Sequence, residues 1–382
     1  MSNATAVQIP KKVLRATVGL VFFLAGLTFA SWASRIAGIQ QKLNLSDAAL
    51  GGILFTLPVG LMLSLPFSGW VITRIGSRKL LLFALPLYAA ALFGLGLAQT
   101  TLQLIAVLFC FGFTSNAVNI SINTQAVATE KLYNKPILAS FHGLWSLAGF
   151  AGAAIGTLMI GKGIDPSVHF GLIFVVVVVG VAIAARYLQD DAGTVQSGPV
   201  FVMPDASLVK LGAVAFCSMI CEGAMFDWSV VYFKKVIHAE NAWMAAGYTA
   251  FMSTMAAGRF VADWFSGQFG LKRTLQVSGS LTATGLMIAV LFPYLIPALA
   301  GFLLVGAGVS SVVPLVYSAA GRSATMSPGV ALAAVSTIGF AGFLVGPPLI
   351  GFIAGAFSLR ASFTLIAAMG ICVVIVSSKA KI

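Results

Sequence analysis

Charged residues are scarce in this sequence. Asp, Glu, Lys and Arg make up 8% of its 382 residues, against about 25% in soluble domains. Histidine occurs 3 times and cysteine 4 times, and the cysteines lie in apolar stretches without metal-ligand spacing. These shortages exclude an ordinary soluble domain, and we expect neither a metal site nor another cofactor.

Hydrophobic residues account for 59% of the chain, and its mean hydropathy is +1.01. Apolar stretches of about 20 residues, long enough to cross a bilayer as a helix, recur along it. The stretch "GLIFVVVVVGVAIAA" (171–185) lacks the alternation of a barrel strand. The sequence therefore predicts an all-α polytopic membrane protein with twelve transmembrane helices, at 14–38, 48–73, 79–98, 101–128, 136–161, 168–189, 208–234, 242–267, 273–292, 295–320, 328–356 and 360–378.

The formal net charge of +12 is unevenly placed along these spans. If the N-terminus lies inside, 16 of the 22 Lys and Arg residues fall in or beside inside loops. This bias orients membrane helices, so it predicts the inner membrane of a bacterium, with both termini in the cytoplasm. The basic charge then reports topology, and the expected surroundings are lipid and no nucleic acid. The six exceptions are Arg35, Lys42, Lys162, Lys234, Lys235 and Arg360.

A polar stretch, "QDDAGTVQSGPVFVMPDAS" (189–207), divides the chain in the middle. It predicts an N-terminal bundle of six helices over 1–189, a cytoplasmic linker over 190–207 and a second bundle over 208–382. The two sides resemble each other at an offset of 194 to 196 residues. "GSRK" (76–79) matches "GLKR" (270–273), and Trp32 matches Trp228. A shared offset indicates an internal repeat.

Two stretches of this repeat resemble a family signature. "GWVITRIGSRK" (69–79) and "GRFVADWFSGQFGLKR" (258–273) are similar to the loop signature of the major facilitator superfamily. The resemblance implies two pseudo-symmetric six-helix bundles around a central cavity, with gating charges. Thr73 occupies the family's aspartate position, which puts that gating contact in doubt. Arg259 and Asp263 would form either a local ion pair or a gate latch; the predicted gating residues are Arg74, Arg78, Arg259, Asp263 and Arg322.

A narrower likeness comes from "HGLWS" (142–146) and "EGAMFDWSVVY" (222–232), which resemble a bacterial branch of the superfamily akin to sugar and fucose permeases. The superfamily resemblance implies that spans 1, 4, 7 and 10 line the cavity. Span 4 carries three amides on one helical face, and three intramembrane amides favour a wet cavity. The predicted solute-binding residues are Asn116, Asn119, Asn123, Thr28, Ser31, Trp32, Arg35, Trp228, Ser310 and Tyr317.

Some of these positions have a structural alternative. Arg35, near the outer end of span 1, would snorkel to the membrane interface or pair with an acid or an anionic solute. Trp228 would stack on a sugar ring or pack between helices. His142, near the inside end of span 5, would relay protons or pack against a neighbouring helix.

Span 7 carries two acids, Glu222 and Asp227, within an apolar run. Five residues place them about 140° apart around the helix, with Glu222 nearer the midplane. Intramembrane acids are functional candidates by default, because a carboxyl group in a low-dielectric site can load and release a proton. We predict proton coupling through Glu222 or Asp227; the alternative is a fixed structural ion pair, for example of Asp227 with Lys234 or Arg35.

No catalytic constellation or phosphate loop is found in the sequence, so an enzyme is not expected. The sequence predicts a monomeric secondary active transporter that moves a small polar solute, sugars among the candidates, by alternating access and proton symport. Two alternatives remain open at this point. One is efflux of drugs or metabolites by proton antiport, and the other is a non-transporting receptor or scaffold with the same fold.

Overall fold

The structure, a computed structural model, describes residues 10–133, 137–190, 206–323, 326 and 328–379, except the side chains at 139, 206, 263, 328, 329 and 333. Within these ranges every regular element is a helix, which confirms the all-α prediction. The elements are α1 (Lys11–Lys42), α2 (Asp47–Leu54), α3 (Thr56–Leu97), α4 (Thr101–Tyr133), α5 (Leu138–Gly161), α6 (Pro166–Ala184), α7 (Ala206–Lys235), η1 (Asn241–Trp243), α8 (Ala246–Phe269), α9 (Leu271–Leu291), α10 (Leu295–Val309), α11 (Val312–Ala320), α12 (Pro328–Ala356) and α13 (Leu359–Lys379).

Twelve membrane crossings follow from these helices. Among the described residues, 10 segments are long and apolar enough to span a bilayer. One of them, Asp47–Leu97, has 51 residues, about 75 Å of helix, which exceeds one crossing of about 30 Å. It therefore holds two crossings. Helix α8 completes the twelve; it has 24 residues but carries Arg259 and Asp263, and it is not among the 10.

The chain reverses inside α3 and between α8 and α9 through the same backbone conformation. Gly76 has φ 82° and ψ 161°, and Gly270 has φ 80° and ψ 157°. Residues other than glycine hardly populate this backbone region, so glycine is required at both turns. The two glycines are 194 residues apart, which is the offset of the sequence repeat.

Helix packing repeats at the same offset. A Cβ on Gly112 would lie 2.0 Å from the Leu57 carbonyl oxygen, and a Cβ on Gly306 would lie 2.1 Å from the Phe251 carbonyl oxygen. Glycine at these two positions lets α4 approach α3, and α10 approach α8, to backbone contact. The pseudo-symmetry expected from the sequence is therefore present in the packing.

The tenth crossing is broken into α10 and α11 at Ser310 and Ser311. The cause is Pro314, which has no N–H to donate to the carbonyl of Ser310 and whose ring crowds that carbonyl. The fourth crossing, its counterpart in the repeat, runs as one uninterrupted helix, α4.

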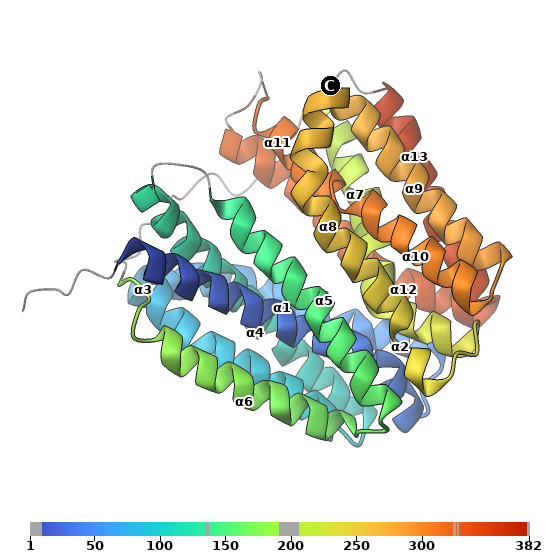
Figure 1. Cartoon of the computed structure of the whole chain (residues 1–382), viewed down its shortest axis with the longest axis horizontal. Coiled ribbons are helices and arrows are strands. Elements are labelled where there is room, and N and C mark those ends of the chain that lie inside the picture. Colours follow the sequence, from blue (N-terminus) through green and yellow to red (C-terminus); the bar gives the residue numbers. More distant parts are fainter. Residues whose placement is uncertain (1–9, 134–136, 191–205, 324–325, 327, 380–382) are drawn as a thin grey trace, which may run out of the picture.

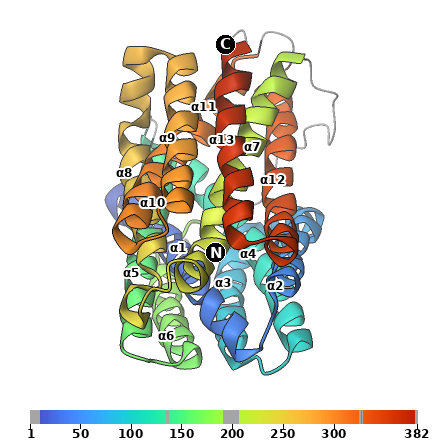
Figure 2. The same cartoon turned by 90° about the vertical axis from the view of Figure 1, so that its right-hand side faces the viewer.

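Helices α1–α6 form one half of the molecule and η1 with α7–α13 the other (Figures 1 and 2). Helix α1 begins at Lys11 and α13 ends at Lys379 on the same side of the molecule, which we call the terminal face. The opposite side is the closed face. At the closed face the halves are in contact: Gly51 of α2 meets Gly351 of α12 at backbone distance. Towards the terminal face the halves diverge (Figure 1).

Charged and polar side chains also join the halves at the closed face. Lys235 Nζ lies 2.5 Å from Asp47 Oδ1, and Lys234 donates a hydrogen bond to Gln41. The hydroxyls of Thr157 and Thr249 are 3.0 Å apart. We refer to the Lys235–Asp47 and Lys234–Gln41 contacts together as the closed-face latch.

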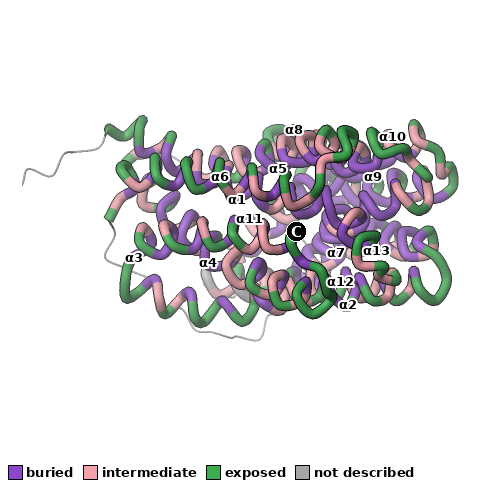
Figure 3. The backbone as a smooth tube through the Cα atoms, turned by 90° about the horizontal axis from the view of Figure 1, so that it is seen from below, coloured by how far each residue is buried: buried purple, intermediate pink, exposed green. Residues whose placement is uncertain are grey.

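The outer flanks of the molecule suit a bilayer. Exposed residues lie along the flanks of α3 and α6, and buried residues lie where helices meet (Figure 3). Large apolar side chains are exposed there, including Phe83 and Leu87 on α3 and Val175 and Val179 on α6. The linker predicted at 190–207 lies outside the described residues, apart from Asp190 and the first residues of α7, so the domain boundaries stay predictions.

Candidate functional site

An ion pair lies within the membrane-spanning part of the second half. Glu222 of α7 faces Arg259 of α8, with Arg259 Nη2 3.5 Å from Glu222 Oε1. Their side chains are 9% and 21% exposed, respectively, so the pair is largely but not fully enclosed. Because α7 and α8 belong to the same half, the pair itself does not hold the halves together.

Arg259 also reaches the other half. Its Nη1 donates to the Ser146 hydroxyl of α5 at 2.5 Å, and its guanidinium carbon lies 5.9 Å from the centre of the Trp145 ring. A cation at this distance is attracted by the ring face. Arg259 is therefore a direct connection between Glu222 and the first half. The structure pairs Arg259 with Glu222 of α7. Because the side chain of Asp263 lies outside the described residues, the Arg259–Asp263 contact stays a prediction.

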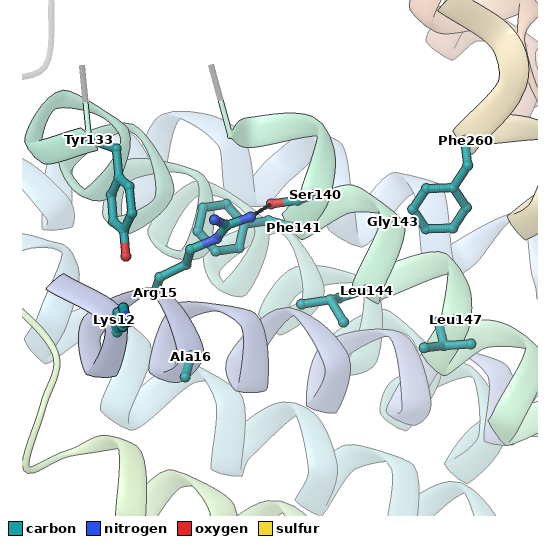
Figure 4. Close-up of a pocket in the computed structure, with 10 residues that line it drawn as sticks. All are labelled: Lys12, Arg15, Ala16, Tyr133, Ser140, Phe141, Gly143, Leu144, Leu147 and Phe260. Carbon is teal, nitrogen blue, oxygen red and sulfur yellow. Dashed lines mark hydrogen bonds between the residues drawn. The ribbon is translucent and has the colours of Figure 1, made fainter. Parts of the chain in front are cut away.

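A groove at the terminal face runs along the first half as far as Phe260 of α8, and neither Glu222, Arg259 nor Ser146 is among its lining residues. Its volume is about 710 Å³, and it is bordered by α1, α4 and α5 and by Phe260 of α8 (Figure 4). Lys12 and Arg15 lie at one end of it, where Arg15 donates to Ser140 and sits over the Tyr133 ring. Phe260, which follows Arg259 in the chain, lies at the other end, beside Gly143.

His142 is exposed on α5, one turn before Ser146. Its ring meets Phe22 edge-on at 5.3 Å, and it lies within electrostatic reach of Arg259. His142 lies near the start of α5, as the sequence predicts for span 5. Its role as a proton relay stays a prediction.

Asp227 has different surroundings from Glu222. The residues on either side of it, from Cys221 to Phe233, are all buried, whereas Asp227 itself is partly exposed. Because its helix neighbours are buried, Asp227 does not lie on an exposed flank of α7. Among the described residues it has no hydrogen bond or ion pair, and Tyr248 of α8 lies within electrostatic reach. An ion pair with Lys234 or Arg35, the structural alternative, is absent there, because both cations bind other partners.

The asparagines of α4 present one continuous polar face. Asn116 is 3% exposed, Asn119 is exposed and Asn123 is half-buried. Asn123 Nδ2 donates to the backbone and side-chain oxygens of Asn119, at 2.8 and 2.9 Å. The buried Asn116 Nδ2 has no hydrogen-bond partner among the described residues. Exposed amides inside a membrane favour contact with water, which fits a wet cavity.

The polar residues of α1 are buried within the first half. Thr28 and Ser31 are fully buried and donate to carbonyls of their own helix. Arg35 is 5% exposed and donates to His169 Nδ1 at 3.2 Å and to the Ile164 carbonyl at 2.8 Å. The expectation that Arg35 snorkels to the interface is wrong, because the buried His169 of α6 and the carbonyl of the half-buried Ile164 in the preceding loop hold its buried side chain.

Asp165 lies in the loop that Arg35 contacts and caps the N-terminus of α6. Its carboxylate accepts hydrogen bonds from the Ser167 backbone N–H and hydroxyl, at 2.8 and 2.6 Å. These hydrogen bonds hold the pKa of the Asp165 carboxyl below its ordinary value. The loop between α5 and α6 is thereby fixed where Arg35 docks.

The two tryptophans matched by the repeat, Trp32 and Trp228, are 1% and 0% exposed. Each indole N–H lacks a hydrogen-bond acceptor among the described residues. Ser310 is buried at the α10–α11 break and bonds its own helix, while Tyr317 of α11 is half-buried. In this conformation the tryptophans and Ser310 pack inside the protein, and their roles in solute binding stay predictions.

The remaining predicted gating residues do not meet across the halves in the described contacts. Arg74 is exposed and lies over the Trp70 ring. Arg78 pairs with Asp190 at 2.6 Å and donates to the Ala185 carbonyl, within the first half. Arg322 is exposed after α11, and the side chain of Asp263 lies outside the described residues.

Two features were not singled out from the sequence as functional. One is Ser146, although it ends the quoted "HGLWS". The other is the closed-face latch of Lys234, Lys235, Gln41 and Asp47. The available signal was that Lys234 and Lys235 break the positive-inside bias, and a cation on the wrong side needs a local reason.

Comparison with known proteins agrees with this architecture. The sequence profile described as the Major Facilitator Superfamily matches residues 18–329. Curated relatives include an uncharacterised MFS-type transporter of Yersinia pestis, 32% identical over 91% of each chain. Membrane protein MosC of Rhizobium meliloti is 32% identical over 95% of this chain and 89% of its own.

Solved structures share the fold at low identity. The nucleoside transporter NupG superposes with a TM-score of 0.77 at 10% identity, over 96% of this chain and 98% of its own. A bacterial homologue of the human lysosomal transporter Spinster, in an inward-facing and unoccupied conformation, gives a TM-score of 0.72 at 14% identity, over 96% and 95%. These likenesses show the fold alone. The profile match and the curated relatives establish that this chain belongs to the major facilitator superfamily and is a polytopic membrane transporter of that type.

Proposed function

We propose that this protein is a proton-coupled symporter that carries a small polar solute across the bacterial inner membrane, with its terminal face in the cytoplasm. The observation that carries the proposal is the Glu222–Arg259–Ser146 chain of contacts. Protonation of Glu222 removes the charge that holds Arg259 on its own half. The Arg259 contacts to Ser146 and Trp145 then change strength, which links the proton to the relation between the halves.

The conformation supports an alternating-access cycle. The halves are joined at the closed face by the latch and diverge towards the terminal face, where the groove begins. Solute and proton would reach Glu222 from the terminal face in this state. Opening at the other face requires the latch to break and the terminal side to close, so that Glu222 exchanges its proton there.

Asp227 is the second proton-carrying candidate. It is partly exposed and has no charged partner among the described residues. It lies about 7.5 Å further along α7 towards the closed face, which would suit exchange with that side. The asparagine face of α4 supplies neutral donors and acceptors for a polar solute.

The test begins with a thermal-shift screen of sugars, sugar acids, nucleosides and amphipathic drugs at two pH values, because a ligand stabilises the state it binds. Uptake of the hit into proteoliposomes is then measured with a pH gradient of either sign. Symport accumulates solute when the outside is the more acidic, and antiport does so when the lumen is. A receptor or scaffold moves no solute in either case.

The coupling residues are tested by Glu222→Gln and Asp227→Asn in the same assay. Loss of gradient-driven accumulation, with exchange of solute across the membrane retained, is expected for the variant at the coupling site. Proton coupling through span 7 is excluded if both variants concentrate the solute as well as the unmodified protein.

A further inference from the structure

The Arg259 guanidinium is only partly satisfied in this structure. It has five N–H donors; Nη1 binds Ser146 at 2.5 Å, and Nη2 lies at the long distance of 3.5 Å from Glu222. Nε is buried and has no hydrogen-bond partner among the described residues. A buried donor without an acceptor is costly, so this nitrogen needs an explanation.

The free donor and the weak contact share one edge of the guanidinium. The N–H of Nε and one N–H of Nη2 point the same way, and this edge binds a carboxylate through two parallel hydrogen bonds. Glu222 reaches Nη2 alone, through a single long contact. A carboxylate from outside could therefore bind both nitrogens and displace Glu222.

The surroundings favour an anion at this edge. Trp145 supports the guanidinium from one side. The groove at the terminal face, which ends at the chain neighbour of Arg259, Phe260, contains Lys12 and Arg15, and no acidic residue occurs among its described lining residues; Arg259 itself does not line it (Figure 4). Cations along a path in low-dielectric walls raise the local concentration of anions.

We infer that the solute is a small monocarboxylate anion whose carboxylate binds Arg259 in exchange for Glu222, which takes up the proton. The inference rests on the proposed function and adds the class of solute to it. Protonation of Glu222 removes one negative charge, and the carboxylate of the bound solute restores it. Arg259 therefore has one anionic partner throughout the exchange. Neutral sugars lack the group that this edge requires.

The exchange has a definite pH dependence. Binding strengthens as pH falls, because protonation of Glu222 removes the competing carboxylate while a solute carboxyl group with a pKa of about 3–5 stays largely ionised at pH 6. Other groups that titrate near the pair are His142 on α5, Asp227 and Cys221 on α7, Tyr248 on α8 and Tyr317 on α11. Of these, His142 ordinarily titrates closest to neutral pH, so His142→Gln is included as a control.

The experiment uses the purified full chain in nanodiscs and pairs of probes that differ in one carboxylate: D-glucuronate with D-glucose, L-lactate with propane-1,2-diol, and acetate with acetamide, at constant ionic strength. Apparent Tm is measured at pH 6 and pH 8. At least one acid is expected to raise Tm above its neutral partner, with an apparent affinity at least several-fold higher at pH 6. His142→Gln should retain this pH dependence.

Three variants connect the shift to Arg259. Arg259→Gln should abolish the rise in Tm caused by the acid. Glu222→Gln should retain this rise and make it equal at pH 6 and pH 8, because no competing charge remains. Arg259→Lys retains the positive charge but not the paired N–H donors of the guanidinium, so it should weaken binding of the acid about tenfold or more. This variant replaces Arg259→Gln in the test if Arg259→Gln fails to fold. Arg360→Gln is the matched control, since Arg360 binds only the Val290 carbonyl on the closed face among its described contacts.

The inference is overturned if no acid raises Tm above its neutral partner, if a neutral partner gives the same shift, or if the shift survives Arg259→Gln. These results differ from a failure of proton symport. Proton-coupled uptake of a neutral solute would remove the carboxylate assignment alone, and carboxylate binding without proton movement would remove the coupling alone.

Discussion

At the scale of single residues, the buried charges of the two halves have different kinds of partners. Arg35 binds two neutral acceptors, His169 and the Ile164 carbonyl, within one half. Arg259 binds an acid on its own half and a hydroxyl on the other, and its Nε has no hydrogen-bond partner among the described residues. The first arrangement is satisfied and static, whereas the second can exchange partners.

This contrast predicts a structural role for Arg35. Arg35→Leu should lower the apparent Tm of the solute-free protein by several degrees, because it leaves buried polar groups without a donor, at about 1–3 kcal/mol each. The measurement is thermal unfolding in detergent or nanodiscs. An unchanged Tm combined with lost solute binding would contradict the prediction and return Arg35 to the solute-binding residues.

At the scale of helices, small residues and turns set the geometry on which the site depends. Glycines at 112 and 306 bring neighbouring helices to backbone contact. Gly76 and Gly270 reverse the chain at the terminal face in a conformation that excludes other residues. Because Gly270 ends α8, the turn also helps to fix the register of the helix that carries Arg259.

Gly270→Ala should therefore destabilise the protein by about 1–3 kcal/mol, the cost of a side chain in this backbone region. Gly267→Ala, three residues earlier in α8, is the matched control, because its Cβ meets open space and its φ is not positive. It should be neutral or slightly stabilising. Apparent Tm is the readout for both, and equal effects of the two variants would disprove the explanation by turn conformation.

At the scale of the whole molecule, the latch at the closed face sets the balance between the two openings. Lys235 and Asp47 are partly exposed, at 39% and 18%, and exposed ion pairs contribute about 0.2–1 kcal/mol. An energy of this size changes the ratio of two conformations by at most about fivefold. That is small enough for a transport cycle to overcome and large enough to measure.

Asp47→Asn should shift the population towards opening at the closed face by up to about fivefold. Spin labels at Lys162→Cys and Glu240→Cys, one exposed residue on each half, introduced after replacement of the native cysteines, would report longer distances in double electron–electron resonance. Asp190→Asn is the matched control, since Asp190 pairs with Arg78 inside one half. The same shift in both variants would mean that the latch has no specific effect.

The sequence by itself determined the membrane class, the twelve crossings, the repeat and the family. These properties depend on local composition, on the length of apolar runs and on positions where the backbone requires glycine or proline. All of them act within one helix or turn. It also singled out Glu222 and Asp227, since an acid is costly in any apolar span.

Only the tertiary structure decided which charges meet. Arg259 pairs with Glu222, which is 37 residues distant in the sequence and lies on another helix, and Lys235 meets Asp47 from the other half. Arg35 is held inside the first half by His169. Side-chain partners depend on how separate helices are rotated and tilted against each other, and that follows from packing over the whole molecule rather than from any local stretch of sequence.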